Sequence, residues 1–476
     1  MPRPLSLVAL AAIAAAGSSP LKAQQPADSA ARRAAAQPQD TSSACPGCPR
    51  RRPVFAFAET MMINVLVNRF DAWVANQDWA RVGPDDWSRN LRLGWEWDED
   101  EFPNNMFSHP YHGGLYFNAG RSNGLDYWES VPLAFLGSAT WEYFAEAYRP
   151  SLNDFFMTSF GGIALGETFH RLGASIRDNT RRGGSRTFRE IAALPLDPVG
   201  SINRLFSGGW SKVGPNPPEH DPGAYVFRLG GGLRIAEDTT VMDTTQSSAA
   251  VIADLVYGDR FARPYRAPFD VFSVRAQVST YNGLNVLRSS GRLYGRNINR
   301  EAARNRHLFE VNQRYDFVNN RALKFGAQSV EAGVASRWRL GRRTTLRSDL
   351  FIDGIVMGAL DAPYSGVGER TYDFGPGLGV RLDFAFEKDG ITRVAWVSRE
   401  EWIHSVSGAA ADHFVALNAL EITVPVYRDM GLGFYLSGYE RYSKYPGQPT
   451  EHRDYPEVRF MVTWTTSAIA LARPNP

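Results

Sequence analysis

The sequence has little cysteine. Only two of its 476 residues are cysteines, Cys45 and Cys48, in the order Cys-Pro-Gly-Cys. A second pair of cysteines or a neighbouring histidine would be needed to complete a zinc site, and the sequence has neither. We therefore expect a tight disulfide between Cys45 and Cys48, formed in an oxidising compartment.

An excess of charge of one sign is also missing. The chain carries 52 Lys and Arg residues against 50 Asp and Glu, a net charge of +2, and its basic residues are scattered. This balance gives no support for nucleic acid as a partner. Beyond the N-terminus, no stretch of 18 uncharged apolar residues occurs, so we expect no ordinary transmembrane helix.

Familiar catalytic signatures are absent too. The sequence has no G-x-S-x-G, no H-E-x-x-H and no phosphate-binding loop. It therefore identifies no cofactor-binding residues, and it leaves open whether a cofactor or a metal is bound and whether the protein is an enzyme.

The N-terminus has the pattern of a secretory signal. Arg3 is followed by an apolar segment, Leu5 to Ala16, and by small residues. We predict a signal peptide over 1–23, cleaved near Ala23. Residues 24–53 are rich in Gln, Ala, Ser and Pro, and we predict a disordered linker there.

Residues 220–468 have a strand pattern. Over 380–387 and 457–464, apolar and charged side chains alternate for about eight residues, which is typical of a tilted membrane strand. A soluble β-sandwich also alternates. However, the polar faces are dense in Arg, Asp and Glu, as in a hydrated lumen, and Tyr and Trp recur near strand ends, as in an interfacial belt.

Twelve strands are predicted, and an even number closes a barrel without an exposed edge. The fold class is therefore α+β, with an N-terminal helical domain followed by an antiparallel transmembrane β-barrel in a bacterial outer membrane. The strands are expected near 223–236, 249–258, 270–281, 285–296, 306–317, 326–340, 343–359, 371–387, 391–405, 412–428, 431–443 and 455–466.

The helical domain is expected over 54–215. One helix is predicted from Tyr127 to Ala147, and a second starts after Ser151, which has the pattern of a helix cap. Residues 186–212 form a broken amphipathic segment. That segment suits either a helix at a membrane surface or a helix packed on the barrel rim.

The helical domain carries ionisable residues at apolar-looking positions, and these are the candidate site. His109 and Glu142 are the candidate catalytic residues. The surrounding polar cluster is predicted to contain His112, Arg121, Glu146, Asp154, Glu167 and His170. Such a set suits a metal site or an acid–base pair. The alternative is a satisfied charge network in which Arg121, Arg149 and Arg171 neutralise the acids and Asp154 caps a helix.

The helical domain also contains a set of short motifs. They are Asn104-Asn105, His109-Pro110-Tyr111-x-Gly113, Ala119-x-Arg121-Ser122-x-Gly124, Trp141-Glu142-Tyr143, Pro150-Ser151-x-x-Asp154 and Gly166-Glu167. This set resembles an uncharacterised, domain-of-unknown-function family of Gram-negative envelope proteins. The resemblance covers roughly residues 55–215, and it implies an envelope location but no established activity.

Two functions are the main hypotheses from the sequence, and a purely structural scaffold is a third. The first is an outer-membrane barrel with a helical plug or periplasmic domain, which serves transport or envelope organisation. The second is an envelope enzyme that acts on lipid or lipopolysaccharide through His109 and Glu142. Both make outer-membrane lipid or lipopolysaccharide the expected partner.

Overall fold

The computed structural model describes residues 47–220, 223–238, 244–262, 264–280, 283–300, 304–320, 323–364 and 370–468. The chain divides into Met1–Cys45 and Pro46–Pro476, and every described residue lies in the second unit. The predicted signal peptide, most of the linker and Cys45 lie outside the described residues. Cys48 is disulfide-bonded.

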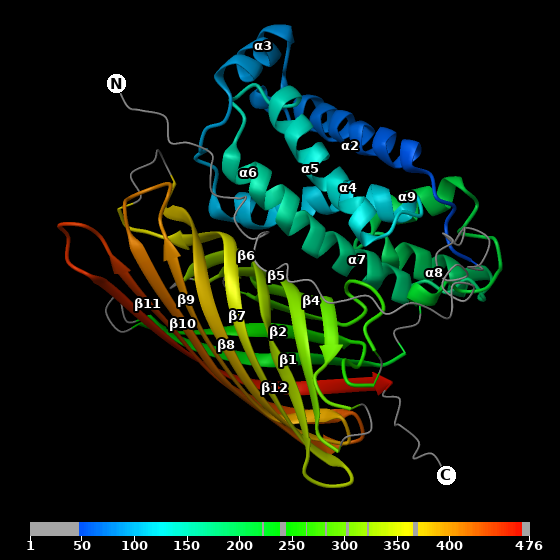
Figure 1. The fold of residues 1–476 in the computed structure, drawn as a ribbon, viewed down its shortest axis with the longest axis vertical. Coiled ribbons are helices and arrows are strands. Elements are labelled where there is room, and N and C mark those ends of the chain that lie inside the picture. Colours follow the sequence, from blue (N-terminus) through cyan, green and yellow to red (C-terminus); the bar gives the residue numbers. More distant parts are fainter. Residues whose placement is uncertain are drawn as a thin grey trace, which may run out of the picture. The chain divides into compact units, whose positions relative to one another are not determined.

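The helical part of the chain lies beside the barrel, and its first described helix, α2, begins at Pro53 (Figure 1). The predicted helix at Tyr127 is α5, and the next helix begins at Leu152, where the Ser151 hydroxyl accepts a hydrogen bond from the Asp154 N–H at 3.2 Å. None of the described helices is long and apolar enough to cross a membrane. The helices are α2 (Pro53–Trp73), η1 (Asp78–Ala80), α3 (Pro84–Leu93), η2 (Asn104–Ser108), α4 (His109–Ser122), α5 (Tyr127–Phe144), α6 (Leu152–Phe156), η3 (Met157–Gly161), α7 (Gly162–Ile176), α8 (Gly183–Ala193), α9 (Pro198–Phe206) and η4 (Pro218–His220).

Twelve antiparallel strands close into a barrel, with β1 paired to both β2 and β12. All twelve predicted strands are confirmed, with ends that differ by a few residues. The strands are β1 (Tyr225–Asp238), β2 (Thr244–Tyr257), β3 (Phe272–Ser279), β4 (Gly283–Asn297), β5 (Arg306–Asn319), β6 (Lys324–Arg339), β7 (Thr344–Asp361), β8 (Tyr372–Lys388), β9 (Ile391–His404), β10 (Asp412–Tyr427), β11 (Met430–Lys444) and β12 (Glu451–Ala468).

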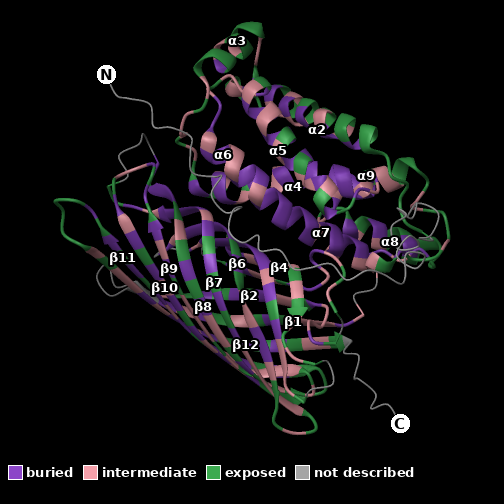
Figure 2. Ribbon diagram, in the orientation of Figure 1, coloured by how far each residue is buried: buried purple, intermediate pink, exposed green. Residues whose placement is uncertain are grey.

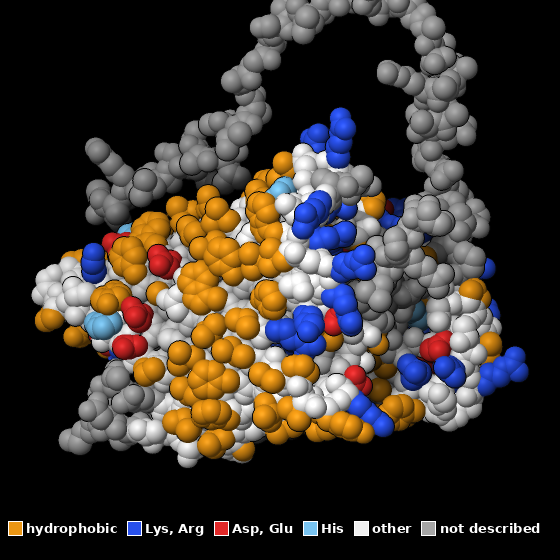
Figure 3. Space-filling model, turned by 90° about the horizontal axis from the view of Figure 1, so that it is seen from below, with side chains coloured by type: hydrophobic (Ala, Val, Ile, Leu, Met, Phe, Trp, Pro, Cys, Tyr) orange, Lys and Arg blue, Asp and Glu red, His pale blue; other side chains and the backbone are white. Residues whose placement is uncertain are grey.

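The two faces of the barrel wall differ in polarity. Inward-facing charges pair across the lumen, as Arg275 of β3 does with Glu421 of β10. Outward-facing side chains such as Leu350, Ile352 and Phe460 are apolar and exposed, and hydrophobic side chains cover much of the outer face in Figure 3. An apolar outer wall and a charged interior are the features of an outer-membrane barrel.

The helices lie against the outside of the barrel wall. Gln313 and Tyr315 of β5 alternate with Arg314 and Asp316, which are part of the interior charge network. The outward Gln313 accepts a hydrogen bond from the Tyr127 hydroxyl at 2.6 Å, and the Tyr315 hydroxyl donates to the Met106 carbonyl at 2.5 Å. Of the two arrangements that the sequence left open, the lumen plug is excluded, because the strands present to the helices the face that alternates with the lumen face.

The wall contact has an apolar core. Phe102, Met106 and Leu165 of the helical domain pack with Phe317 and Phe374 of the outward faces of β5 and β8. In Figure 2 the side of the helical domain that meets the strands is mostly buried, whereas α2 has an exposed face. Apolar burial of this kind is the main source of stability at such a contact.

Helices α4 and the η3–α7 segment approach one another closely through small residues. A Cβ atom built on Gly113 would lie 1.8 Å from the Thr158 carbonyl oxygen, and one built on Gly162 would lie 2.4 Å from the Gly113 carbonyl carbon. Gly114 and Gly166 also face each other at this crossing. The glycines thus form the surface at which α4 and the η3–α7 segment meet, and this crossing brings His109 and Asp154 together.

Replacing Gly113 by Ala is expected to destabilise the helical domain by about 3 kcal/mol, because the new methyl group meets backbone that cannot move aside. Thermal unfolding of the purified full-length protein would measure the loss. The control is Gly184→Ala, because nothing lies within 4 Å of that Cβ position. Equal stability of the two variants would contradict the close crossing.

Candidate functional site

The structure divides the predicted polar cluster into two separate groups. Arg121, Glu167 and His170 belong to a group that contains arginines. His109, His112, Glu142, Glu146 and Asp154 belong to a second group around the start of α4. Glu167 and His170, which the sequence placed together, bond to different partners in the first group.

The first group is a satisfied charge network. Glu167 accepts hydrogen bonds from Arg121 Nε at 2.8 Å and Arg171 Nε at 2.7 Å. His170 contacts Asp197 through Nδ1 at 3.5 Å and Glu219 through Nε2 at 3.3 Å. The neutralisation of Glu167 by Arg121 and Arg171 was one of the two alternatives left open. Arg149, the third arginine of that alternative, pairs instead with Glu96 at 2.8 Å.

The stability of this network is expected to depend on pH through His170. Burial disfavours the charged imidazole, but hydrogen bonds to Asp197 and Glu219 outweigh burial and raise the pKa of His170, even with Arg121 close by. A raised pKa in the folded state means that the stabilisation is complete below about pH 6.5 and is lost as the pH rises through the folded value.

The melting temperature of the full-length protein, measured from about pH 6 to about pH 9, would test this expectation. The wild type should lose more stability over this range than His170→Gln. His452→Gln, at an exposed position, should keep the wild-type slope. Identical slopes for the wild type and His170→Gln would contradict the assignment.

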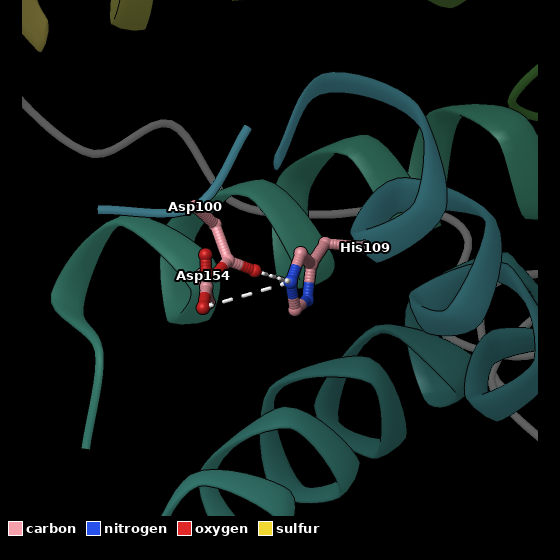
Figure 4. A group of neighbouring side chains, drawn as sticks. All are labelled: Asp100, His109 and Asp154. Carbon is pink, nitrogen blue, oxygen red and sulfur yellow. Dashed lines mark ion pairs between the residues drawn. The ribbon is translucent and has the colours of Figure 1, made fainter. Parts of the chain in front are cut away.

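The second group has a histidine at its centre (Figure 4). His109 Nε2 lies 3.7 Å from Asp100 Oδ2 and 3.6 Å from Asp154 Oδ2. One ligand-type atom from each residue lies within 4.8 Å of the other two. His109 and Asp154 are buried, whereas the Asp100 side chain is 46% exposed, so the group reaches the surface at Asp100.

Three further carboxylates surround this triad. Asp98 accepts hydrogen bonds from Asn153 at 2.6 Å and from Asn105 at 3.1 Å. Glu146 accepts one from the Trp141 indole at 2.6 Å. Glu142 is 1% exposed; its Oε2 accepts a hydrogen bond from the Ser151 N–H, while its Oε1 is buried without any partner.

Arginine does not neutralise this second group. Within the described residues, no Lys or Arg forms an ion pair with Asp98, Glu142 or Glu146. Arg370 lies near Asp98, but it donates a hydrogen bond to the Asp98 backbone carbonyl and not to the carboxylate. The group therefore departs from the satisfied network that the sequence also allowed. Asp154 does not act as a cap either, because Ser151 has that role.

The pKa values of Glu142, Glu146 and Asp154 are raised, whereas hydrogen bonds and the His109 charge outweigh burial and lower the pKa of Asp98. Burial and the Glu146 charge raise the pKa of Glu142 well above its usual range, and burial raises the pKa of Glu146 to about 7. Burial and the Asp98 charge raise the pKa of Asp154. Burial disfavours the charged imidazole, but the hydrogen bond to Asp100 and the surrounding carboxylates raise the pKa of His109, so His109 offsets part of the repulsion. A bound metal cation would relieve the repulsion further.

His112 is not part of the triad and contacts Tyr116 and Trp141. Its Nε2 is 3.0 Å from the Tyr116 hydroxyl, and its ring meets Trp141 edge-on with 4.6 Å between the ring centres. Burial and the nearby His109 lower the pKa of His112 to about 3. His112 is thus a neutral imidazole that packs behind His109.

Two π-helical turns shape the site. η2 (Asn104–Ser108) ends where His109 begins, and η3 (Met157–Gly161) follows the turn that carries Asp154. A π turn adds one residue to a helical turn and recurs at functional sites. Thr158 within η3 places its hydroxyl 3.4 Å from His109 Nδ1, which orients the other ring nitrogen toward the two aspartates.

This arrangement suits a divalent first-row metal ion. One imidazole and two carboxylates are a common ligand set for Mn²⁺, Fe²⁺ or Zn²⁺, whereas Ca²⁺ and Mg²⁺ prefer oxygen ligands alone. The partnerless Glu142 oxygen is available to accept a proton. The group therefore allows metal-assisted hydrolysis or acid–base chemistry.

Sequence reasoning missed several residues of both groups. Asp98 and Asp100 lie in an irregular acidic stretch that resembles a solvated loop, and only the fold carries them to His109. Asp197 and Glu219 reach His170 from 27 and 49 residues away along the chain. The spacing of residues along the chain contains no signal for such contacts.

A hydroxyl–imidazole–carboxylate chain inside the barrel was also missed. His413 bonds Ser443 through Nδ1 at 2.9 Å and Asp373 through Nε2 at 3.2 Å. The Ser443 and His413 side chains are fully buried, and Asp373 is 1% exposed. We interpret these hydrogen bonds as a structural link between β8, β10 and β11.

Solved structures that are similar to this chain are outer-membrane porins and channels. The KdgM porin in complex with disordered oligogalacturonate is 6% identical, with a TM-score of 0.24 over 51% of this chain and 98% of its own. OpdQ of Pseudomonas aeruginosa is 9% identical, with a TM-score of 0.20 over 52% and 97%. The channel DcaP of Acinetobacter baumannii is 6% identical, with a TM-score of 0.22 over 51% and 96%. Scores this low add nothing to the closed barrel that the strand pairing already shows.

Part of the helical domain matches a protein-family model. No curated protein matches the chain. Residues 94–199 match the model of the family described as "Domain of unknown function (DUF3943)", a narrower segment than the predicted resemblance over 55–215. That segment contains the whole group from Asp98 to Asp154. The protein thus joins an outer-membrane-type barrel to a segment that matches the model of this family, and the acid–histidine group without arginine partners lies within that segment.

Proposed function

We propose that the helical domain binds a divalent metal ion at Asp100, His109 and Asp154 and uses it for hydrolysis of an anionic envelope lipid. The metal ion would activate a water molecule, and Glu142 would accept its proton. The protein would be anchored in the outer membrane by its barrel. Lipopolysaccharide is the partner of this chemistry that such a membrane offers.

One observation supports this proposal above the others. Other buried carboxylates of the helical domain pair with arginine, as Glu167 and Glu190 do. The acids around His109 have no such partner in the described part of the chain. Unpaired buried carboxylates are costly, so their presence favours a cation as the missing component.

Exposed apolar side chains on the helices support a lipid as substrate. Leu66 and Trp73 of α2, Phe188 of α8 and Phe206 of α9 are each at least 60% exposed. Surfaces of this kind mark contact with a membrane or a partner. α8 and α9 pack on α7 and α4, which fits the membrane-surface alternative for residues 186–212.

Transport through the barrel has less support. The lumen is filled at one end by a cluster of buried apolar side chains that includes Phe325, Ile403 and Tyr439. A hydrated channel needs a continuous polar path. In the described part of the barrel this cluster interrupts the path.

Lipid mass spectrometry of whole envelopes would test the hydrolysis. The strains would be a null strain and null strains that carry the wild type, Glu142→Gln, His109→Gln or Asp85→Asn. Asp85 is an exposed acid of α3 and serves as the control. We expect a lipid species that accumulates in the null strain to return to normal with the wild type and Asp85→Asn, but not with Glu142→Gln or His109→Gln.

Each variant must be present as a folded barrel for the comparison to hold. Migration of unheated samples on a gel reports this, since folded outer-membrane barrels migrate differently from unfolded ones. Identical lipids in all strains with folded protein would refute hydrolysis of an envelope lipid.

A further inference from the structure

Apolar side chains close the lumen of the barrel at one end. The apolar cluster in it contains inward-facing side chains from eight strands, including Ala236 of β1, Val318 of β5 and Leu417 of β10. These residues lie near the strand ends opposite the barrel's own first and last residues, Tyr225 and Ala468. The gap left at this cluster measures about 10 Å³, which is about the minimum for one water molecule.

The other half of the lumen is a large cavity. Its volume is about 1360 Å³, and it extends to Tyr225 and Ser467, next to the barrel termini. Leu417 lines both this cavity and the small gap, so the apolar cluster forms its floor. The cavity is therefore a vestibule that opens at the end of the barrel where its chain termini lie.

The vestibule has an excess of positive charge. Of the described residues that line it, fourteen are arginines and seven are Asp or Glu. Many of the arginines are paired, as Arg275 is with Asp254 and Glu421. Arg228, Arg339 and Arg342 have no carboxylate within ion-pair distance among the described residues, and the Nε of Arg228 is buried without a partner.

We propose that this vestibule binds a small polyanion that carries phosphate or carboxylate groups. Guanidinium groups bind both groups through two parallel hydrogen bonds. Arginines that line a low-dielectric wall strengthen the field at its centre, so a multivalent anion gains more than a monovalent one. This site is independent of the metal centre, because the residues that line it belong to the barrel strands and to the segments between them, and none belongs to the helical domain.

Calorimetric titration of the full-length protein in neutral detergent, with metals removed by a chelator, would test the site. Tripolyphosphate and citrate are the two probes, and they separate a phosphate ligand from a carboxylate ligand. We expect at least one to bind at low salt, and the affinity to fall as salt rises. The double variant Arg339→Gln/Arg342→Gln should bind at least about tenfold more weakly.

Arg182→Gln is the matched control, because Arg182 is an exposed arginine of the helical domain; it should bind as the wild type does. Arg228→Gln tests the deeper wall and should also weaken binding. Asp154→Asn should leave anion binding unchanged, which separates this site from the metal centre. Absence of binding by both probes, or equal affinity of the wild type and the double variant, would overturn the proposal.

Discussion

Replacing Asp154 by Asn is expected to weaken the binding of Mn²⁺ or Zn²⁺ by about 100-fold or more. The substitution keeps the shape of the side chain but removes one of two anionic ligands that face His109 Nε2. It also removes an acid from a cluster of buried carboxylates that repel one another. The metal-free variant should therefore melt at a higher temperature than the metal-free wild type. Metal titration and thermal unfolding of the purified full-length protein measure both effects.

The test is specific because the substitution is expected to weaken metal binding and yet to raise the melting temperature of the metal-free protein. A residue with a purely structural role would lower stability with and without metal. Asp154→Asn should instead stabilise the metal-free protein and abolish the gain in melting temperature that Mn²⁺ or Zn²⁺ gives to the wild type. Asp85→Asn should leave both unchanged. A wild type that gains no stability from these ions, or from Fe²⁺, would refute the metal centre.

Replacing Arg314 by Met is expected to destabilise the barrel by about 3–5 kcal/mol. Arg314 contacts Asp316 at 2.5 Å, Glu401 at 3.3 Å and Asp353 inside the lumen. Asp316 keeps Arg288 and Arg399 as partners. Asp353 and Glu401 would keep no cationic partner among the described residues, and an unpaired buried charge carries the full desolvation cost.

The temperature at which the folded form disappears from unheated gel samples would measure this loss, and a fall of about 10 °C is expected for a domain of this size. Arg296→Met is the control, since Arg296 is exposed on the outward face of β4. The double variant Arg314→Met/Asp353→Asn should recover part of the loss. A barrel that tolerates Arg314→Met as well as Arg296→Met would show that the lumen charges are solvated rather than paired.

The sequence by itself determined the barrel and the start of the helices. Strand position follows from alternation, which is a local property: residue 381 faces the lumen because residues 380 and 382 face outward. The cap at Ser151 is likewise read from neighbouring residues. The close helix crossing depends on glycines at positions 113, 162 and 166, because a side chain there would meet the facing helix.

Only the tertiary structure decided what the polar residues of the helical domain do. Glu142 and Glu167 look alike in the sequence, as acids in apolar helices, yet Glu167 meets two arginines and Glu142 meets none. The difference depends on which helices cross, and Asp98 joins the group from a segment outside any helix.

The position of the helices on the outside of the barrel wall also depends on the tertiary structure. Alternation fixes two faces of each strand, but it does not say which neighbour covers the outward face. Tyr315 and Phe317 of β5 would suit lipid as well as they suit the helices that cover them. Apolar contact is not directional, so the choice between lipid and helix is made only when the chain has folded.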